Sequence, residues 1–295
     1  MTTVLNTQEV LTPPVPSATV LVLRDGVQGL EVLLVKRHSK SNVLGGMHVF
    51  PGGKLDAADR SVQREQLDQA PQALVQALGE ADLDEATACG LHVAALRETL
   101  EECGLFLHGQ HDSRLPAQMR QRLQAGESFL AANAALGLTL QTGLVRPWSR
   151  WITPRKPTMM DRRFDTRFFV ALAPTDHEAK HDAHEVTEAV WVRPEAALRQ
   201  YWEGHMGLVP AQIMSLMQLM PHTRAGEVLQ EAQSRPPIQV LPEPIDIDGE
   251  RVLCYPGDPQ HPVQVPVWPG PTRLTWRNQR FEPEGGLDAF LGSHR

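Results

Sequence analysis

The strongest pattern in the chain is Ala94-Ala95-Leu96-Arg97-Glu98-Thr99-Leu100-Glu101-Glu102-Cys103-Gly104-Leu105. Leu96 and Leu100 are four residues apart, which predicts a helix with one apolar face, and Gly104 suits the left-handed residue that ends a helix. On this helix, Glu98 faces Glu101 and Glu102, and like charges at such spacing repel by about 0.2–0.5 kcal/mol per pair. A hard divalent cation would turn this repulsion into attraction, because Mg2+ and Mn2+ prefer oxygen ligands.

A solvated acidic helix face is the alternative interpretation of the same charge run. The upstream segment Phe50-Pro51-Gly52-Gly53-Lys54 favours the cation site. Two consecutive glycines allow the backbone to approach an ion closely, whereas an ordinary turn after a strand would need no such pair.

Together the two segments resemble the Nudix hydrolases, whose box reads Gly-x5-Glu-x7-Arg-Glu-U-x-Glu-Glu-x-Gly-U, where U is a bulky aliphatic residue. Gly53 opens the box, Asp59 stands where the family has its first Glu, and residues 97–105 match the second half, with Thr99 at an aliphatic position. Asp59 and Arg97 are separated by 37 residues instead of 7, so about 30 residues are inserted. This interrupted box is similar to the branch that includes peroxisomal coenzyme A diphosphatases and their bacterial relatives. The segment 162–169 adds to the resemblance, which covers roughly residues 17–220.

The resemblance implies an α+β fold, a Nudix-type α/β/α sandwich with a mixed sheet. It also implies Mg2+- or Mn2+-dependent hydrolysis of a diphosphate bond in a nucleoside diphosphate derivative, foremost coenzyme A or acyl-coenzyme A. Dinucleotides and nucleoside diphosphate sugars are the alternative substrates. A non-catalytic, ligand-binding Nudix domain is the alternative class, although binding alone would not need three mutually repelling acids.

The same resemblance assigns roles to individual residues. The metal ligands would be the Gly52 carbonyl and the carboxylates of Glu98, Glu101 and Glu102. The general base would be Glu98 or Glu185, and the sequence does not choose between them. Glu185 precedes Trp191 by six residues, and Glu188 is an alternate in the same region, which could also be a solvated loop. Arg97, with Asp59, would orient Glu98.

Substrate contacts are predicted at Arg37, Phe50, Arg163 and Arg167. Arg37 ends a predicted strand, where a positive charge could meet phosphate or simply make a sheet edge soluble. Arg163 and Arg167 belong to a local basic patch in an acidic protein. Such a patch suits a polyphosphate, but its members could also pair with nearby acids.

Composition limits the remaining function classes. The 295 residues carry a formal net charge of −7, which argues against a nucleic-acid groove and against binding to an anionic membrane surface. We find no signal-peptide pattern, no run of 18 apolar residues and no Ser-Lys-Leu ending, and the three cysteines show no metal-binding spacing. We therefore expect a cytoplasmic enzyme with a small-molecule diphosphate substrate. The sequence does not indicate an oligomeric state.

The expected organisation is a loose lead-in (1–16), a Nudix domain (17–222) and a Pro- and Gly-rich β tail packed on it (223–295). Two insertions interrupt the domain, at 60–85 and, with helical character, at 108–145. The first reads as one amphipathic helix containing Leu67, Leu74, Val75 and Leu78. Strands are predicted at 18–23, 30–36, 47–50, 148–152, 164–172, 238–241, 251–254, 263–267 and 273–276, and further helices at 117–124, 127–136, 194–203 and 210–220.

Overall fold

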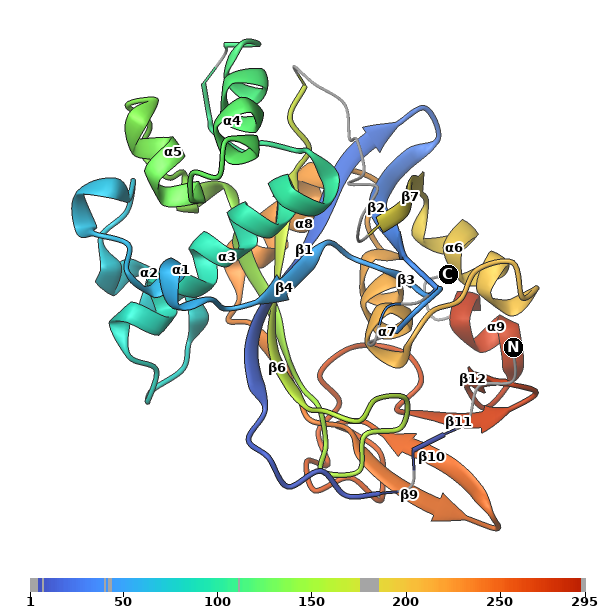
Figure 1. Cartoon of the computed structure of the whole chain (residues 1–295). Helices are drawn as coiled ribbons and strands as arrows, with labels where there is room; N and C mark the ends of the chain where they lie inside the picture. The colour runs from blue at the N-terminus through green and yellow to red at the C-terminus, as the bar shows by residue number, and fades with distance from the viewer. Residues whose placement is uncertain are drawn as a thin grey trace.

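The computed structural model describes residues 5–6, 8–39, 41, 44–110, 112–175 and 186–292. Within these residues a mixed sheet lies between two layers of helices, and a second, smaller sheet follows at the C-terminal end (Figure 1). The predicted α+β sandwich is therefore confirmed.

The main sheet has the order β3-β2-β1-β6-β5-β8, with β4 added beside β1 and β7 beside β2. β1 pairs antiparallel with β2 through a hairpin at Gly26 and Gly29, as predicted, and runs parallel to β6. The pairs of β5 with β6 and of β2 with β7 are antiparallel. Its strands are β1 (Val15–Gly26), β2 (Gly29–Arg37), β3 (His48–Val49), β4 (Gly52–Lys54), β5 (Arg146–Ile152), β6 (Phe164–Leu172), β7 (Val186–Val192) and β8 (Ile238–Val240).

Successive side chains of each strand point to opposite faces of the sheet, so the strands contribute to two cores, one on each face. Val20 and Val22 of β1 pack toward the helices of the first half of the chain, whereas Leu21 and Leu23 pack into the opposite core. All four side chains are fully buried. The run of residues 20–23 is apolar at every position, as a sheet covered on both faces requires.

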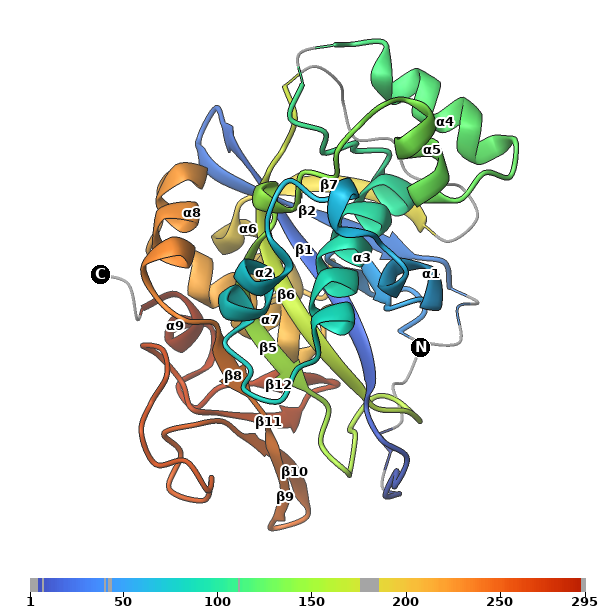
Figure 2. The ribbon, with the colours of Figure 1, turned by 90° about the vertical axis from the view of Figure 1, so that its left-hand side faces the viewer.

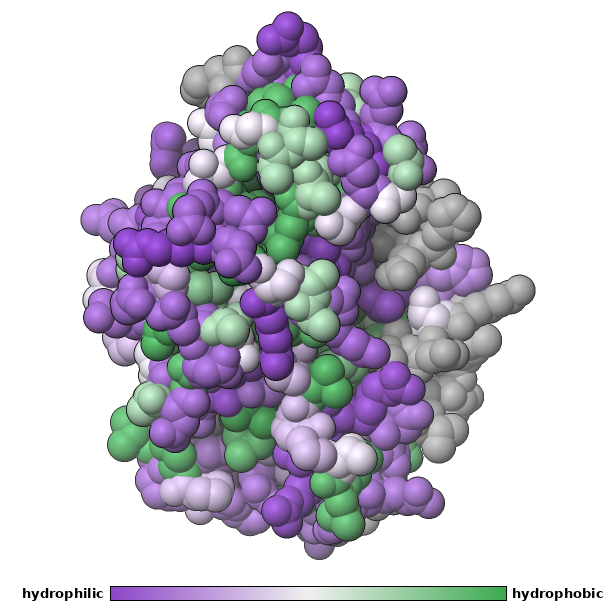
Figure 3. Space-filling view, turned by 60° about the vertical axis from the view of Figure 1, so that its left-hand side comes forward, coloured by the Kyte–Doolittle hydropathy of each residue, from purple (hydrophilic) through white to green (hydrophobic). Residues whose placement is uncertain are grey.

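The helices divide between the two faces. Figure 2 shows α3, α4 and α5 on one side of the strands and α6, α7 and α8 on the other. Their bounds are α1 (Ala57–Arg60), α2 (Pro71–Leu78), α3 (Glu85–Cys103), α4 (Leu115–Gln124), α5 (Phe129–Ala135), α6 (Pro194–Trp202), α7 (Pro210–Leu219), α8 (Ala225–Ser234) and α9 (Gly286–Leu291). The surface beside α2 and α5 is mostly hydrophilic, with its hydrophobic residues in separate patches (Figure 3).

α3 carries the acidic pattern and is fixed at both ends. Asp84 caps its start by accepting a hydrogen bond from the Thr87 backbone at 2.9 Å, and Gly104 ends it with φ of 66°. The buried Thr99, which stands at an aliphatic position of the box, donates its hydroxyl to the Ala95 carbonyl at 2.8 Å. Because this hydroxyl is satisfied within the helix, the polar residue is tolerated in the core.

The first insertion is not the single helix that the sequence predicts. It follows α1 and consists of a 3-10 turn at Arg64–Gln66 and α2, and Leu67 lies ahead of α2 in a bridge with Leu140. Pro71 starts α2 at its first position, so the residues before it cannot continue the same helix. Leu74 and Leu78 are buried on the helix face that the pattern indicated.

Asp68 joins the two insertions. Its carboxylate accepts hydrogen bonds from the backbone of Thr142 at 2.8 Å and of Gly143 at 3.1 Å, and from the Thr142 hydroxyl. This side chain adds to the backbone hydrogen bonds between residues 66–68 and Leu140, which join the same two segments.

The C-terminal region contributes to both sheets. Its strands β9 (Glu243–Ile247), β10 (Glu250–Cys254), β11 (Arg273–Arg277) and β12 (Arg280–Glu282) form an antiparallel sheet of order β12-β11-β10-β9, whereas β8 joins the main sheet beside β5. The predicted strand at 263–267 is wrong, because the segment is irregular. It contains Pro266 and lies between Pro262 and Pro269, and proline cannot donate to a sheet.

Side chains of the C-terminal region, among them Leu253, Tyr255 and Phe281, lie in the same core as α6 and α7. The division into lead-in, domain and tail stays a prediction. Across the described residues, no helix is long and apolar enough to cross a membrane. The three cysteines are buried and unpaired with one another.

We expect Asp68→Ala to lower the free energy of unfolding by about 1–3 kcal/mol, because it removes the carboxylate that accepts from the buried Thr142 hydroxyl. Urea denaturation followed by circular dichroism measures the change. The exposed Asp82, in the same insertion, supplies the control Asp82→Ala, which should stay near wild type. Equal stability of the two variants would show that Asp68 does not hold the insertions together.

Candidate active site

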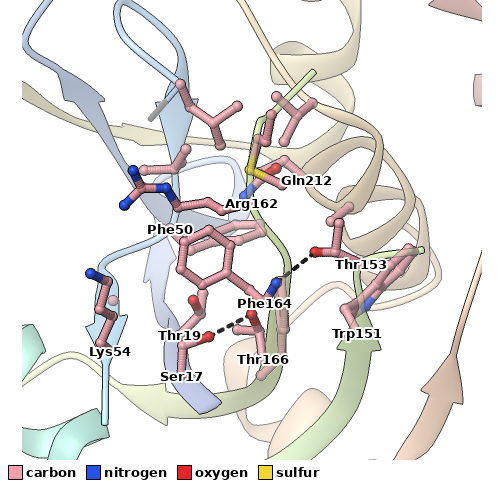
Figure 4. Close-up of a pocket in the computed structure, with 18 of the residues that line it drawn as sticks. Ser17, Thr19, Phe50, Lys54, Trp151, Thr153, Arg162, Phe164, Thr166 and Gln212 are labelled. Atoms are coloured by element: carbon pink, nitrogen blue, oxygen red, sulfur yellow. Dashed lines mark hydrogen bonds between the residues drawn. The ribbon is translucent and has the colours of Figure 1, made fainter. Parts of the chain in front are cut away.

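A cleft of about 890 Å3 opens between the Gly52–Gly53 turn, the C-terminal end of α3 and the loop that joins β5 to β6. Figure 4 shows Lys54 at one side of it, Trp151 and Thr153 at the other, and Phe50 and Phe164 between them. The volume lies within the range of small-molecule sites in proteins.

The glycine turn is pinned to the sheet. β4 pairs with β1, so that Gly53 lies opposite Ala18 and Gly52 opposite Thr19. A Cβ atom at Gly52 would lie 2.6 Å from Oγ1 of Thr19, and one at Gly53 would overlap the carboxylate of Glu98. The two glycines are therefore required by close approach, and they bring the backbone against the acidic helix.

Arg97 is the centre of the charged cluster. Its guanidinium makes a two-bond contact with Asp59, at 3.0 and 2.9 Å, and Nη1 donates to Glu98 at 2.7 Å and to Glu101 at 2.8 Å. Nη2 also donates to the Lys54 carbonyl at 3.1 Å. Although Asp59 is one methylene shorter than the family's Glu, it reaches Arg97, because α1 brings its backbone close and buries the side chain.

Glu102 turns toward the glycine turn instead. It accepts a hydrogen bond from the Gly52 backbone N–H at 2.9 Å, and its second oxygen lies 3.6 Å from Arg37. Only 4% of Glu102 is exposed. All three predicted carboxylates therefore lie at the turn, two on Arg97 and one on the Gly52 backbone.

Burial raises the pKa values of the two acids that contact Arg97. It raises the pKa of Glu98 to about 7, against the opposing pull of Arg97. Burial raises the pKa of Glu101 in the same way, again opposed by Arg97. A buried carboxylate with a raised pKa is a group whose charged form gains from a nearby cation.

The donors suit a hard divalent ion in kind. They are oxygens, and Glu98 and Glu101 share one nitrogen of Arg97, which places their carboxylates around a common point. Among the described residues, however, no three acid, His or Cys side chains are already grouped around one position. The reason is that Arg97 draws two of the acids together while Glu102 bonds to the backbone.

Two of the four predicted substrate contacts lie in the cleft. Arg37 and Phe50 line it, and Phe50 packs edge-on against Phe168 with 6.3 Å between ring centroids. Arg163 and Arg167 do not line it, so this part of the prediction is wrong. Arg163 donates to the Thr153 carbonyl at 2.9 Å, and the buried Arg167 is ion-paired with Glu80.

Alternation along β6 explains why Arg167 points away from the cleft. Phe164, Thr166 and Phe168 line the cleft, and Arg167 falls on the opposite face of the strand. Arg162, in the bend before β6, lines the cleft and is labelled in Figure 4. Lys54 also lines the cleft, although the sequence did not predict it as a substrate contact.

Glu185 lies outside the described residues, so its predicted role stays a prediction. Glu188, the alternate, is exposed on β7 and is absent from the lining of the cleft.

A family model described as the NUDT19 Nudix domain matches residues 2–219. This chain belongs to that Nudix family. The chain is 28% identical over 225 residues to the acyl-coenzyme A diphosphatase NUDT19 of Xenopus laevis, covering 64% of this chain and 59% of the relative. It is 24% identical over 294 residues to the Gallus gallus protein of the same name, covering 85% and 78%.

A solved structure gives the same assignment. The Nudix hydrolase from Alicyclobacillus acidocaldarius superposes with a TM-score of 0.57 at 27% sequence identity, over 78% of this chain and 99% of that one. Nudix hydrolases generally use divalent metal ions, which agrees with the oxygen donors at the turn.

The raised pKa of Glu98 predicts how stability varies with pH when divalent ions are removed by a chelator. Glu98 binds its proton more tightly in the fold than in the unfolded chain, so its contribution is fully present below pH about 4.5 and is lost as the pH rises through about 7. The free energy of unfolding of wild type relative to Glu98→Gln should fall by on the order of 2 kcal/mol across this window. Urea titrations at a series of pH values test this, and parallel curves for the two proteins would contradict it.

Proposed function

We propose that the chain is a metal-dependent hydrolase that cleaves the diphosphate bond of coenzyme A or an acyl-coenzyme A. The observation that supports this most is that Glu98, Glu101 and Glu102 line one cleft together with Gly52 and Gly53. Membership in the Nudix family and the printed names of the two NUDT19 relatives point to the same chemistry.

The ion would be Mg2+ or Mn2+, held by Glu98, Glu101, Glu102 and the Gly52 carbonyl. When bound, such an ion neutralises the diphosphate oxygens and activates water for attack at phosphorus. Residues of the chain would orient the acids, accept the proton and contact the phosphate oxygens.

Arg97 and Asp59 orient the acids. Because Asp59 holds the guanidinium by two bonds, Nη1 points at Glu98 and keeps its carboxylate against the glycine turn. Glu98, held at the cleft by Arg97 Nη1, is one candidate to take the proton of the attacking water. Glu185 stays the alternative base.

Positively charged side chains line the cleft in which the diphosphate would bind. Arg37, Lys54 and Arg162 line the cleft, and each can meet a phosphate oxygen. Arg162 is 44% exposed at its side chain, so it remains accessible for such a contact. The substrate is a small molecule, and the cytoplasmic location stays a prediction.

Two alternatives remain within the same architecture. Dinucleotides or nucleoside diphosphate sugars would use the same acidic end, and a ligand-binding domain without activity would use the cleft alone. Product analysis separates all of these.

Phosphorus NMR of reactions with coenzyme A, NADH and ADP-ribose, each with Mg2+ and with chelator, tests the proposal. We expect Mg2+-dependent conversion of coenzyme A to phosphopantetheine and adenosine 3′,5′-bisphosphate, because the long cleft suits a linear chain beyond the diphosphate. Preferential cleavage of NADH or ADP-ribose would move the assignment to those substrates. No cleavage of any compound would favour the binding module.

Glu101→Gln should lower kcat/KM by at least roughly 100-fold, because residues that only support a metal ligand already cost 10–100-fold when changed. Folding should persist, since the side chain is 43% exposed and the change removes like-charge repulsion. The control Glu85→Gln, at the other end of α3, should keep near-wild-type activity. Near-normal Mg2+-dependent turnover in Glu101→Gln would overturn the ligand assignment.

A further inference from the structure

The cleft extends across the sheet, away from the acidic turn. Lys54 pairs with Ser17, Ser17 with Thr166, and Thr166 with Trp151, so one row of residues crosses four strands. Three strand spacings amount to roughly 14 Å. The site is therefore elongated, with its charged end at β4 and its far end at β5.

The chemistry of the lining changes along this row. The middle carries hydroxyl groups, and Ser17 and Thr166 are hydrogen-bonded at 2.7 Å. Beyond them lies a set of mainly apolar residues that we name the apolar arm. It comprises Trp151, Met159, Phe168, Pro242 and Leu253.

The aromatic rings of the arm present no open face for stacking. Trp151 is stacked on Trp268, with 6.0 Å between centroids and 21° between planes, and only 6% of it is exposed. Phe168 is 3% exposed and is covered by Phe50 and Trp151. Stacking of a nucleobase uses an exposed aromatic face, whereas an aliphatic chain needs only apolar contact.

One side of the arm is adaptable. Met159 and Met160 line it from the loop between β5 and β6, and both are half-buried. Methionine is unbranched and flexible, so it can follow the shape of chains of different length.

The opposite side comes from the C-terminal region, beyond the residues that the family model matches. Pro242 and Leu253 line the arm, and both are buried. Both are held by a buried polar network. His261 Nε2 bonds to the Leu241 carbonyl at 2.9 Å, directly before Pro242.

The fully buried Asp258 fixes the other part of this network. It accepts from Arg273 at 2.6 and 2.8 Å and from the Gln260 backbone at 2.9 Å. Arg273 pairs in register with Cys254, the residue after Leu253. The Pro256-Gly257-Asp258-Pro259 turn thus positions a wall of the cleft.

We propose that the apolar arm binds the acyl chain of an acyl-coenzyme A, and that Leu253 and Pro242 of the C-terminal region determine which chains fit. This inference rests on the proposed function. With the diphosphate at the acidic turn, the pantetheine amides lie along the hydroxyl groups and the thioester end enters the arm.

The test compares kcat/KM for octanoyl-coenzyme A with that for free coenzyme A in the presence of Mg2+. In Leu253→Ala the ratio of octanoyl to free substrate should fall by about tenfold, the loss typical of a missing apolar contact in a pocket. Met159→Trp fills the arm from the loop, where a half-buried side chain tolerates the change, and should lower the ratio at least as much. Val265→Ala, at an exposed position of the same region, is the matched control and should keep the wild-type ratio.

Unchanged ratios in both Leu253→Ala and Met159→Trp would overturn the inference. An equal loss for both substrates would also overturn it, because the arm would then hold a part common to both, such as the nucleobase. Calorimetric binding of octanoyl and free coenzyme A to the chelated protein separates the inference from the proposed function. If wild type cleaves neither, tighter octanoyl binding that is lost in the two variants still supports the arm, and equal binding of both compounds refutes it.

Discussion

The two-bond contact between Arg97 and Asp59 joins the halves of the interrupted box. Asp59 belongs to the segment after the glycine turn and Arg97 to the middle of α3, yet their side chains meet at 3.0 and 2.9 Å in a buried position. Such paired contacts fix direction as well as distance. Because Arg97 then bonds to Glu98 and Glu101, the geometry of the acids depends on a residue from the far side of the insertion. The inserted residues can vary in path as long as they return the chain to this contact.

Much of this architecture follows from local patterns in the sequence. The helix from residue 85 to 103 is indicated in the sequence by its apolar spacing and by the stop signal Gly104, whereas its start could be Asp82 or Asp84 until the structure shows Asp84 as the cap. The hairpin of β1 and β2 follows from two apolar runs around a glycine turn. In the site, the approach of the acids to Gly52 and Gly53 could be expected because these residues carry the family resemblance.

Other features depend on contacts that no local pattern contains. The pairing of Arg167 with Glu80 could not be foreseen, because Glu80 lies in the insertion, and a surface arginine and a structural one look alike in sequence. The residues 263–267 alternate as a strand does, but the prolines around them remove the donors that a sheet needs. The position of Leu253 in the cleft could not be predicted from the sequence, because it depends on how the C-terminal region folds. That region packs into the same core as α7 and the main sheet.

The parallel pairing of β1 with β6 has a consequence for how the chain folds. Ser17 and Thr166 are partners 149 residues apart, so the centre of the sheet cannot close until more than half of the polypeptide has been synthesised. The first hairpin, by contrast, is local and can form early. Both insertions lie within that long loop, and a contact between them, such as that of Asp68 with Thr142, reduces the length of chain that the closure of β1 onto β6 has to order.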